Sequence, residues 1–102
     1  MPVVVLQSAK NDLRDGCLFY EMLGGAHLCN CFLATLQGEL SSLARFAGIH
    51  SRRFGFHRAL SRRFPYSIYY DIEDGEARVY GVLDNRRDPD WIYSHLRKAR
   101  DF

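Results

Sequence analysis

The chain has 102 residues, of which 47% are hydrophobic and 25% charged, and its formal net charge at pH 7 is +2. This length suits one domain with a single hydrophobic core, so we expect residues 1–102 to fold as one unit. Its apolar runs are far shorter than the roughly 18 residues of a membrane span, and its first residues lack a signal-peptide pattern, so we expect a cytoplasmic protein without a membrane partner.

The N-terminal half of the sequence predicts a strand followed by two helices. Residues 3–6 form a short β-branched run, and Ser8 is placed to cap the helix that follows. Gly24 and Gly25 predict a break in that helix. Apolar residues then keep the helical period through residues 26–47, so a second helix follows the first as a hairpin.

This helical pair carries more apolar residues than one buried stripe can use. The residues outside the main stripes are Leu18, Phe19, Met22, Leu23, Cys29 and Leu33. Either they widen the ordinary core stripe, or part of the hairpin stays exposed until a partner covers it. In the second helix we expect Gly38 to mark a close crossing with another helix, because glycine has no side chain.

The three cysteines are expected to be packing residues. Cys29 and Cys31 are two positions apart, which on a helix directs their side chains to different faces. Three cysteines cannot all pair with one another, so the sequence does not predict a disulfide framework. It also lacks a second Cys or His pair at ligand spacing, so we expect no zinc site and no other metal.

Residues 66–84 contain two β-patterned runs that meet at Asp74 and Gly75, which predicts a hairpin with a two-residue type I′ turn. The expected pairs are Ile72 with Ala77, Asp71 with Arg78, Tyr70 with Val79, and Ile68 with Gly81. The expected core-facing residues are Ile68, Tyr70, Ile72, Ala77, Val79 and Leu83. Glu73 would face Glu76 beside the turn, a like-charge conflict that a longer loop or a bulge would relieve.

The order of elements predicts an α+β fold, β-α-α-β-β-β-α, with the helices on one face of a mainly antiparallel sheet of about four strands, against which the helical hairpin packs. Because a helical hairpin returns the chain to its starting end, we expect the first strand to run opposite to the strand at residues 54–60. Asp88 followed by Pro89 predicts the start of the C-terminal helix.

The middle of the chain is strongly basic. Residues 41–69 contain no Asp or Glu, and their basic residues and histidines are Arg45, His50, Arg52, Arg53, His57, Arg58, Arg62 and Arg63. Arginine suits bidentate contacts to phosphate or carboxylate, although such a stretch can also be only a solvated face.

Common catalytic motifs, including GxSxG, the P-loop and HExxH, do not occur in the sequence. The chemistry that its residues would allow is metal-free phosphodiester cleavage, in which a histidine moves the proton and arginines hold the phosphate. The candidate residues are His57, Arg58, Arg86, Arg87 and His95. The alternative interpretation is that His57 faces solvent on a strand and that His95 packs on a helix surface. We expect no cofactor.

Three sequence motifs resemble one known family. The runs RRFPYSIYY and VYGVLDNRRDP, on either side of the predicted turn, and SAKNDL at the first helix start are similar to the RelE/ParE superfamily of bacterial toxins, also called plasmid stabilization proteins. The resemblance covers nearly the whole chain, including the order of its elements. It implies a compact toxin that is neutralised by a small cognate antitoxin wrapped around the helical hairpin and sheet. The implied apolar contact face is Leu18, Phe19, Met22 and Leu33.

The superfamily has two branches, which differ in their targets. RelE-like members are ribosome-dependent endoribonucleases that cut mRNA, whereas ParE-like members are not nucleases and act on DNA gyrase. Where RelE-like sequences have two arginines and a tyrosine, this chain has Ser67, Asn85 and Trp91. The resemblance therefore implies a ParE-like gyrase inhibitor without catalytic residues. The alternatives are a RelE-like mRNA endonuclease and an inactive binding protein. The residues implied to bind the target or the antitoxin are Arg58, Arg86, Arg87 and Trp91.

Overall fold

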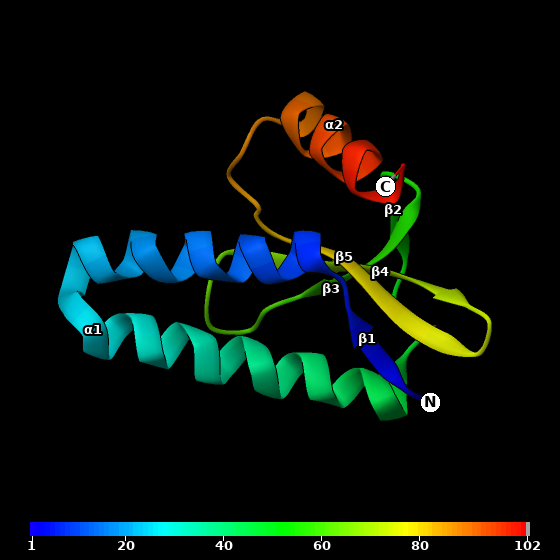
Figure 1. Cartoon of the computed structure of the whole chain (residues 1–102), viewed down its shortest axis with the longest axis horizontal. Coiled ribbons are helices and arrows are strands. Elements are labelled where there is room, and N and C mark those ends of the chain that lie inside the picture. The colour runs from blue at the N-terminus through cyan, green and yellow to red at the C-terminus, as the bar shows by residue number, and fades with distance from the viewer. Residues whose placement is uncertain (102) are drawn as a thin grey trace.

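The computed structural model describes residues 1–101, which form an α+β fold with a five-stranded sheet between two helical layers (Figure 1). The elements are β1 (Val3–Val5), α1 (Gln7–Phe46), β2 (Arg52–Arg53), β3 (Phe56–Leu60), β4 (Tyr66–Glu73), β5 (Glu76–Asp84) and α2 (Pro89–Arg100). The order in the sheet is β1-β5-β4-β3-β2. Neither of these helices is long and apolar enough to cross a membrane.

The predicted helical hairpin is present as two arms of α1. Gly24 and Gly25 have non-helical backbone angles, and the φ of 81° at Gly25 lies in the region that favours glycine. Figure 1 shows the two arms folded back on each other at this point. The predicted cap at Ser8 is wrong. The helix already begins at Gln7, and the Ser8 hydroxyl donates a hydrogen bond to the carbonyl oxygen of Tyr80 in β5 (2.7 Å).

The close contact between the two arms lies at Gly16, not at the predicted Gly38. A Cβ added to Gly16 would stand 2.6 Å from the ring of Phe32, whereas one added to Gly38 would meet no described atom within 4 Å. Gly38 therefore faces open space. Gly16 was overlooked because it sits on the ordinary buried stripe of the first arm, where only the position of the second arm shows that a side chain would clash.

The direction of β1 differs from the prediction. β1 pairs parallel with β5, and because β5, β4 and β3 alternate, β1 also runs parallel to β3. The sheet is therefore mixed. The second arm of α1 is longer than the first, so the chain returns past the C-terminal end of β1 to the N-terminal end of this strand. There the amino group of Met1 donates to the carbonyl oxygen of Ala44 (3.1 Å). Figure 1 shows the N-terminus beside that end of α1.

The hairpin of β4 and β5 confirms the predicted type I′ turn. Asp74 and Gly75 have φ angles of 52° and 74°, and the predicted pairs hold from the turn up to Tyr70 with Val79. The conflict between Glu73 and Glu76 is relieved by Arg78 rather than by a longer loop. Its guanidinium lies 3.8 Å from Glu73 and 3.1 Å from Glu76, so it does not pair with Asp71, which it faces across the strands.

Beyond that point the predicted register is wrong. A shift between Tyr69 and Tyr70 leaves Tyr80 as an extra residue of β5, so Ile68 pairs with Val82 instead of Gly81. Val82 then takes the core position facing α1 that was predicted for Leu83. The other predicted core residues except the partly exposed Ile72 are buried, as expected.

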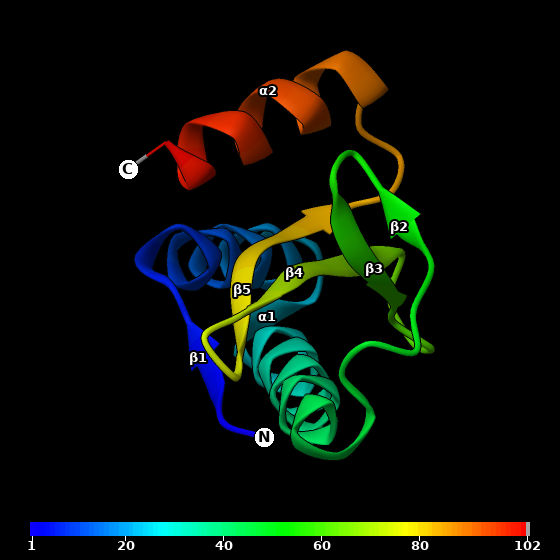
Figure 2. The same cartoon turned by 90° about the vertical axis from the view of Figure 1, so that its right-hand side faces the viewer.

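Helices cover both faces of the sheet, not one as predicted. The core between α1 and the sheet is built around Phe32, Leu36, Leu43, Ile68, Tyr70 and Val79. The core between α2 and the sheet contains Phe56, Tyr69, Tyr80, Leu83, Ile92 and Leu96. Figure 2 shows α2 on one side of the strands and the second arm of α1 on the other. The helix α2 begins as predicted, because the Asp88 side chain accepts from the Asp90 N–H (3.2 Å) ahead of Pro89.

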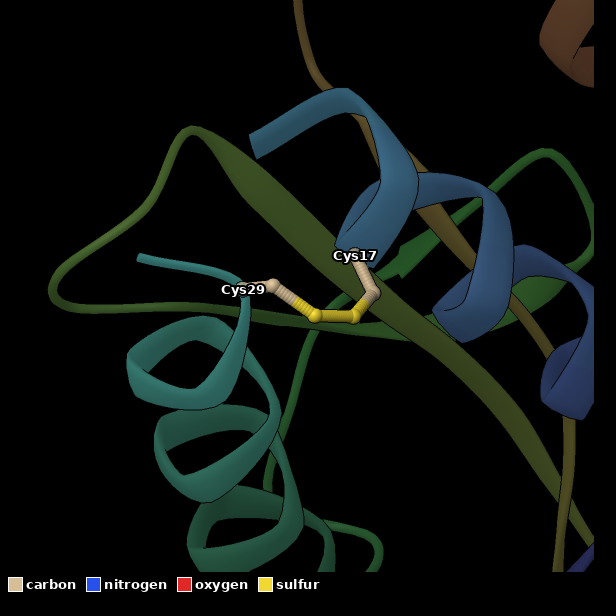
Figure 3. The surroundings of a disulfide bond; sticks show 2 residues. All are labelled: Cys17 and Cys29. Carbon is tan, nitrogen blue, oxygen red and sulfur yellow. A yellow bond between two sulfur atoms is a disulfide. The ribbon is translucent and has the colours of Figure 1, made fainter. Parts of the chain in front are cut away.

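A disulfide bond joins Cys17 to Cys29 across the two arms of α1 (Figure 3), so the prediction that these two cysteines are packing thiols is wrong. Their Cα atoms lie 4.5 Å apart. The prediction compared Cys29 only with its neighbour Cys31. The reversal at Gly24 and Gly25 instead places Cys29 opposite Cys17, while Cys31 is a free thiol.

Candidate functional site

A cleft opens where the first arm of α1, the end of β5 and the start of α2 meet. Its volume is about 320 Å³. The lining residues that carry charge or an aromatic ring are Asp12, Asp15, Phe19, Tyr66, Asp84, Arg87, Trp91 and His95. Residues of α1, β4, β5 and α2, far apart in the sequence, thus line this cleft, and four of the predicted site residues, Phe19, Arg87, Trp91 and His95, meet in it.

The floor of the cleft is a hydrogen-bonded pair of the buried Asp12 and the partly exposed His95. Asp12 is only 6% exposed, and its carboxylate accepts hydrogen bonds from the N–H of Val82 (3.1 Å) and from Nε2 of His95 (2.9 Å). Burial raises the pKa of Asp12, and the hydrogen bond from His95 opposes that rise. A carboxylate can only accept, so Nε2 of His95 carries the proton of this hydrogen bond.

A stack of side chains along α2 forms one wall. The guanidinium carbon of Arg87 lies 3.6 Å from the centre of the Trp91 ring, and the rings of Trp91 and His95 stack at 4.6 Å with an angle of 15°. Trp91 and His95 are spaced by one helical turn, which places them on one face of α2, and Arg87 reaches Trp91 from the loop just before the helix. Trp91 is therefore held between a cation and an imidazole, with part of its surface open to solvent.

The two predicted arginines behave differently. Arg86 donates to Asp84 from both Nε (3.0 Å) and Nη2 (2.7 Å), and these hydrogen bonds lower the pKa of Asp84. The charge of Arg86 is thus already paired. Among residues 1–101, no carboxylate lies within ion-pair distance of Arg87, which leaves its charge available at the cleft.

His57 and Arg58 lie on β3 and do not line the cleft. The ring of His57 stacks on Tyr70 at 5.1 Å, and its Nδ1 donates to the carbonyl oxygen of His50 (2.7 Å). His57 is therefore a packed, hydrogen-bonded residue on the α1 side of the sheet. Arg58 pairs in the ladder with Tyr69 and points to the opposite face. The structure does not bring the two predicted histidines together.

Ser67 and Asn85 are structural. Ser67 is fully buried, and its hydroxyl donates to the side-chain oxygen of Asn85, which follows β5. This hydrogen bond ties the start of β4 to the loop that leads into α2. Neither side chain lines the cleft.

The predicted apolar face lies largely at the tip of the helical hairpin. Met22 is 88% exposed and Leu18 51%, and Phe19 is also exposed. Leu33, on the second arm, differs from the other three because it is partly buried and packs against the core. The neighbouring Leu23 is exposed as well. We call Leu18, Phe19, Met22 and Leu23 the apolar tip.

A second groove, of about 640 Å³, lies between the second arm of α1 and β3 and was not predicted from the sequence. Three of its lining residues are large, apolar and exposed: Phe46, Ile49 and Leu60. Glu39 also lines it, and the Oε1 atom of Glu39 is buried without a hydrogen-bond partner in the part of the chain described. Phe46 and Ile49 lie off the apolar stripe, which ends at Ala47, and that position was the available signal.

Asp12 was also missed. The available signal was its spacing. Asp12 lies three positions after Ala9 and four before Gly16, so on a helix it shares their buried face. Its partner His95 is 83 residues away in the chain, so the pair itself requires the fold. Elsewhere in residues 1–101, no three His, Cys, Asp or Glu side chains gather as metal ligands.

A helical hairpin on one face of this sheet and a short C-terminal helix on the other make up the ParE-like toxin fold. In particular, the chain is similar to one from a solved structure described as the chromosomal ParDE TA system from P. aeruginosa. That likeness has a TM-score of 0.76 and 18% sequence identity, and it covers 82% of this chain and 95% of that one. No protein-family model and no curated protein matches the sequence.

Proposed function

We propose that the protein is the toxin of a type II toxin–antitoxin module, that it acts in the cytoplasm on DNA gyrase, and that a small cognate antitoxin neutralises it. The observation that carries this proposal is the ParE-like toxin fold together with the exposed apolar surface on its helical hairpin. A small protein gains nothing in stability from four large apolar side chains exposed at one tip, whereas a partner that covers them gains binding energy.

The antitoxin would contact the apolar tip and the groove beside β3. An amphipathic segment can place apolar side chains against Leu18 and Met22, and in the groove against Phe46 and Leu60. The unpaired oxygen of Glu39 would receive a hydrogen-bond donor from the same segment. Leu33 contributes through the packing of the second arm rather than as an exposed anchor.

The surface that meets gyrase would include Arg58, Arg87 and Trp91. Arg87 has no paired carboxylate among the described residues, and Trp91 presents aromatic surface next to it. Arginine beside an aromatic ring is a frequent centre of protein interfaces. Arg86 would add to this surface only by giving up its hydrogen bonds to Asp84.

A second candidate is the cleavage of mRNA on the ribosome, because the pair of Asp12 and His95 resembles a general base with its orienting carboxylate. His95 would accept the proton of a 2′-hydroxyl, and Arg87 would contact the phosphate. This activity also needs a proton donor at the leaving oxygen. The phenol of Tyr66 lines the cleft, but burial raises its pKa to about 12, which makes it a poor donor near neutral pH. Gyrase is therefore the first candidate.

Expression in bacteria tests the proposal. Cells producing the protein should stop growing and yield plasmid DNA that is less negatively supercoiled, because gyrase introduces the negative supercoils. The variant with Arg86→Ala and Arg87→Ala should lose both effects, while Arg97→Ala, an exposed arginine elsewhere on α2, should keep them. Growth arrest with unchanged plasmid topology would exclude gyrase as the target.

The antitoxin surface has its own test. Changing Leu18 and Met22 together to Asp should abolish co-purification with the antitoxin encoded beside the toxin gene, while the toxin remains folded. Tyr93→Asp, which adds one negative charge at an exposed aromatic position on α2, should leave the complex intact. Co-purification of the double variant at the level of the wild type would show that the tip is not the contact.

A further inference from the structure

The disulfide between Cys17 and Cys29 closes the part of α1 that carries the apolar tip. All four tip residues lie between the two cysteines, as do Gly24 and Gly25, where the chain reverses. Figure 3 shows the bond running from the first arm to the beginning of the second. The bond therefore stands at the base of the surface that we assign to the antitoxin.

Apart from this bond, few contacts hold the end of the hairpin. Every residue from 21 to 27 is exposed, and the backbone at Gly24 and Gly25 leaves the helical conformation. Next to the disulfide the arms are held firmly, because Phe32 packs against Gly16 and its ring lies 5.1 Å from that of the buried Tyr20. Opening the disulfide should therefore loosen residues 21–27 and leave the rest of the hairpin docked.

The two sulfur atoms differ in access. Cys29 is 7% exposed, whereas Cys17 is only partly buried. A small thiol or disulfide from solution can thus reach Cys17 first, and Cys29 is placed to complete the exchange. Cys31 is not joined to either of them.

From this arrangement we infer that Cys17 and Cys29 form a thiol–disulfide switch that sets the order of the apolar tip and thereby the affinity for the antitoxin. The second part of this inference rests on the proposed function. In the oxidised form the tip is held in one conformation before the partner arrives, so binding costs less conformational entropy. In the reduced form the partner must order the tip, and the affinity falls.

The chemistry is a balanced exchange with a small-molecule disulfide such as oxidised glutathione. The thiolate of Cys17 attacks one sulfur of that disulfide and releases one glutathione thiolate, which takes up a proton. The thiolate of Cys29 then attacks the sulfur of Cys17 in the mixed disulfide and releases the second glutathione. The protein loses two electrons and two protons, and the oxidised glutathione becomes two thiols.

Hydrogen exchange on the whole chain tests the switch without any partner. We expect amides in residues 21–27 to exchange about tenfold faster in reduced than in oxidised glutathione buffer. The conformational entropy of about one backbone residue corresponds to about a factor of ten in the local opening equilibrium. Amides of β4 and β5 should not change. Cys31→Ser should switch like the wild type, and the variant with Cys17→Ser and Cys29→Ser should exchange at the reduced rate in both buffers.

Two results would overturn the inference. One is a wild-type chain that keeps the same number of titratable thiols in both buffers, and the other is equal exchange of residues 21–27 in the two states. Because reduction of the wild type is itself the perturbation, the test stands even where the serine variant fails to fold. Failure of gyrase inhibition would leave the exchange result untouched, so the two proposals fail separately.

The consequence for binding is measured with the adjacent-gene antitoxin as the probe. Its affinity should be about tenfold higher for the oxidised wild type than for the reduced wild type, with no redox dependence in the serine variant. Equal affinities in both states would overturn the part of the inference that concerns the partner.

Discussion

Replacing Asp12 by Ala should lower the free energy of unfolding by about 2 kcal/mol. Without the carboxylate, the N–H of Val82 is left in a buried strand with no acceptor, which costs about 1–3 kcal/mol. The lost hydrogen bond from His95, a partly exposed side chain, adds about 0.5–1.5 kcal/mol. Removing a buried charge offsets part of this sum, because burial raises the pKa of Asp12.

Urea unfolding followed by circular dichroism measures this change in the free energy of unfolding. An unchanged slope of this free energy against urea concentration would show that the folded and unfolded states keep their compactness. Asp12→Asn should cost less than half as much, since its amide oxygen still accepts from Val82. Asp15→Ala is the matched control. It removes an exposed carboxylate from the same cleft and should stay within about 0.5 kcal/mol of the wild type. An Asp12→Ala chain as stable as this control would refute the role assigned to the pair.

Two further perturbations test the packing and the charges. Gly16→Ala should lower the free energy of unfolding by about 1–3 kcal/mol, because its Cβ meets Phe32. Gly38→Ala should raise it by up to about 1 kcal/mol, because Gly38 faces open space and alanine favours the helix. Thermal unfolding that ranks the two variants the other way would contradict the packing of the arms. Burial by itself would raise the pKa of Asp71, but hydrogen bonds from Arg52 and Arg100 lower it to about 2. The stabilisation from these bonds is present above the ordinary pKa of 3.8 and disappears as the pH falls toward 2. The pKa shift of Asp71 sets an upper bound of about 2.4 kcal/mol on this stabilisation, and solvent screening reduces it to about 1 kcal/mol. Asp71→Asn should therefore abolish this part of the loss of stability between pH 4 and about 2.

The parts of the fold that follow from local chemistry could be predicted from the sequence. The turn at Asp74 and Gly75 needs two residues that tolerate positive φ, and the start of α2 needs an acceptor ahead of Pro89. Both are encoded in adjacent residues. The exposed apolar tip could also be predicted, because Leu18 and Met22 stand off the helical stripe whatever the second arm does.

The parts that depend on how distant elements meet could not be predicted in the same way. The register shift near Tyr80 lies where β5 passes so close to α2 that a Cβ on Gly81 would stand 2.8 Å from Leu96. The direction of β1 depends on the relative length of the two arms of α1. The disulfide depends on the reversal that places Cys29 opposite Cys17.

The candidate site shows the same division. Trp91 and His95 share one face of α2 by their spacing, so the sequence could group these two residues. The carboxylate that orients His95 comes from Asp12 on the first arm of α1, and no spacing along the chain brings these two residues together. The same holds for His57, which the sequence places beside Arg58 but the sheet turns toward Tyr70 and the opposite face.

The most direct test of the central claim is a supercoiling assay with purified toxin and purified gyrase, run beside translating ribosomes that carry a defined mRNA. The proposed function predicts that the toxin inhibits supercoiling, that added antitoxin reverses the inhibition, and that the mRNA remains intact. Cleavage of the ribosome-bound mRNA that disappears in the His95→Ala variant, with supercoiling unaffected, would contradict the claim and assign the protein to mRNA cleavage.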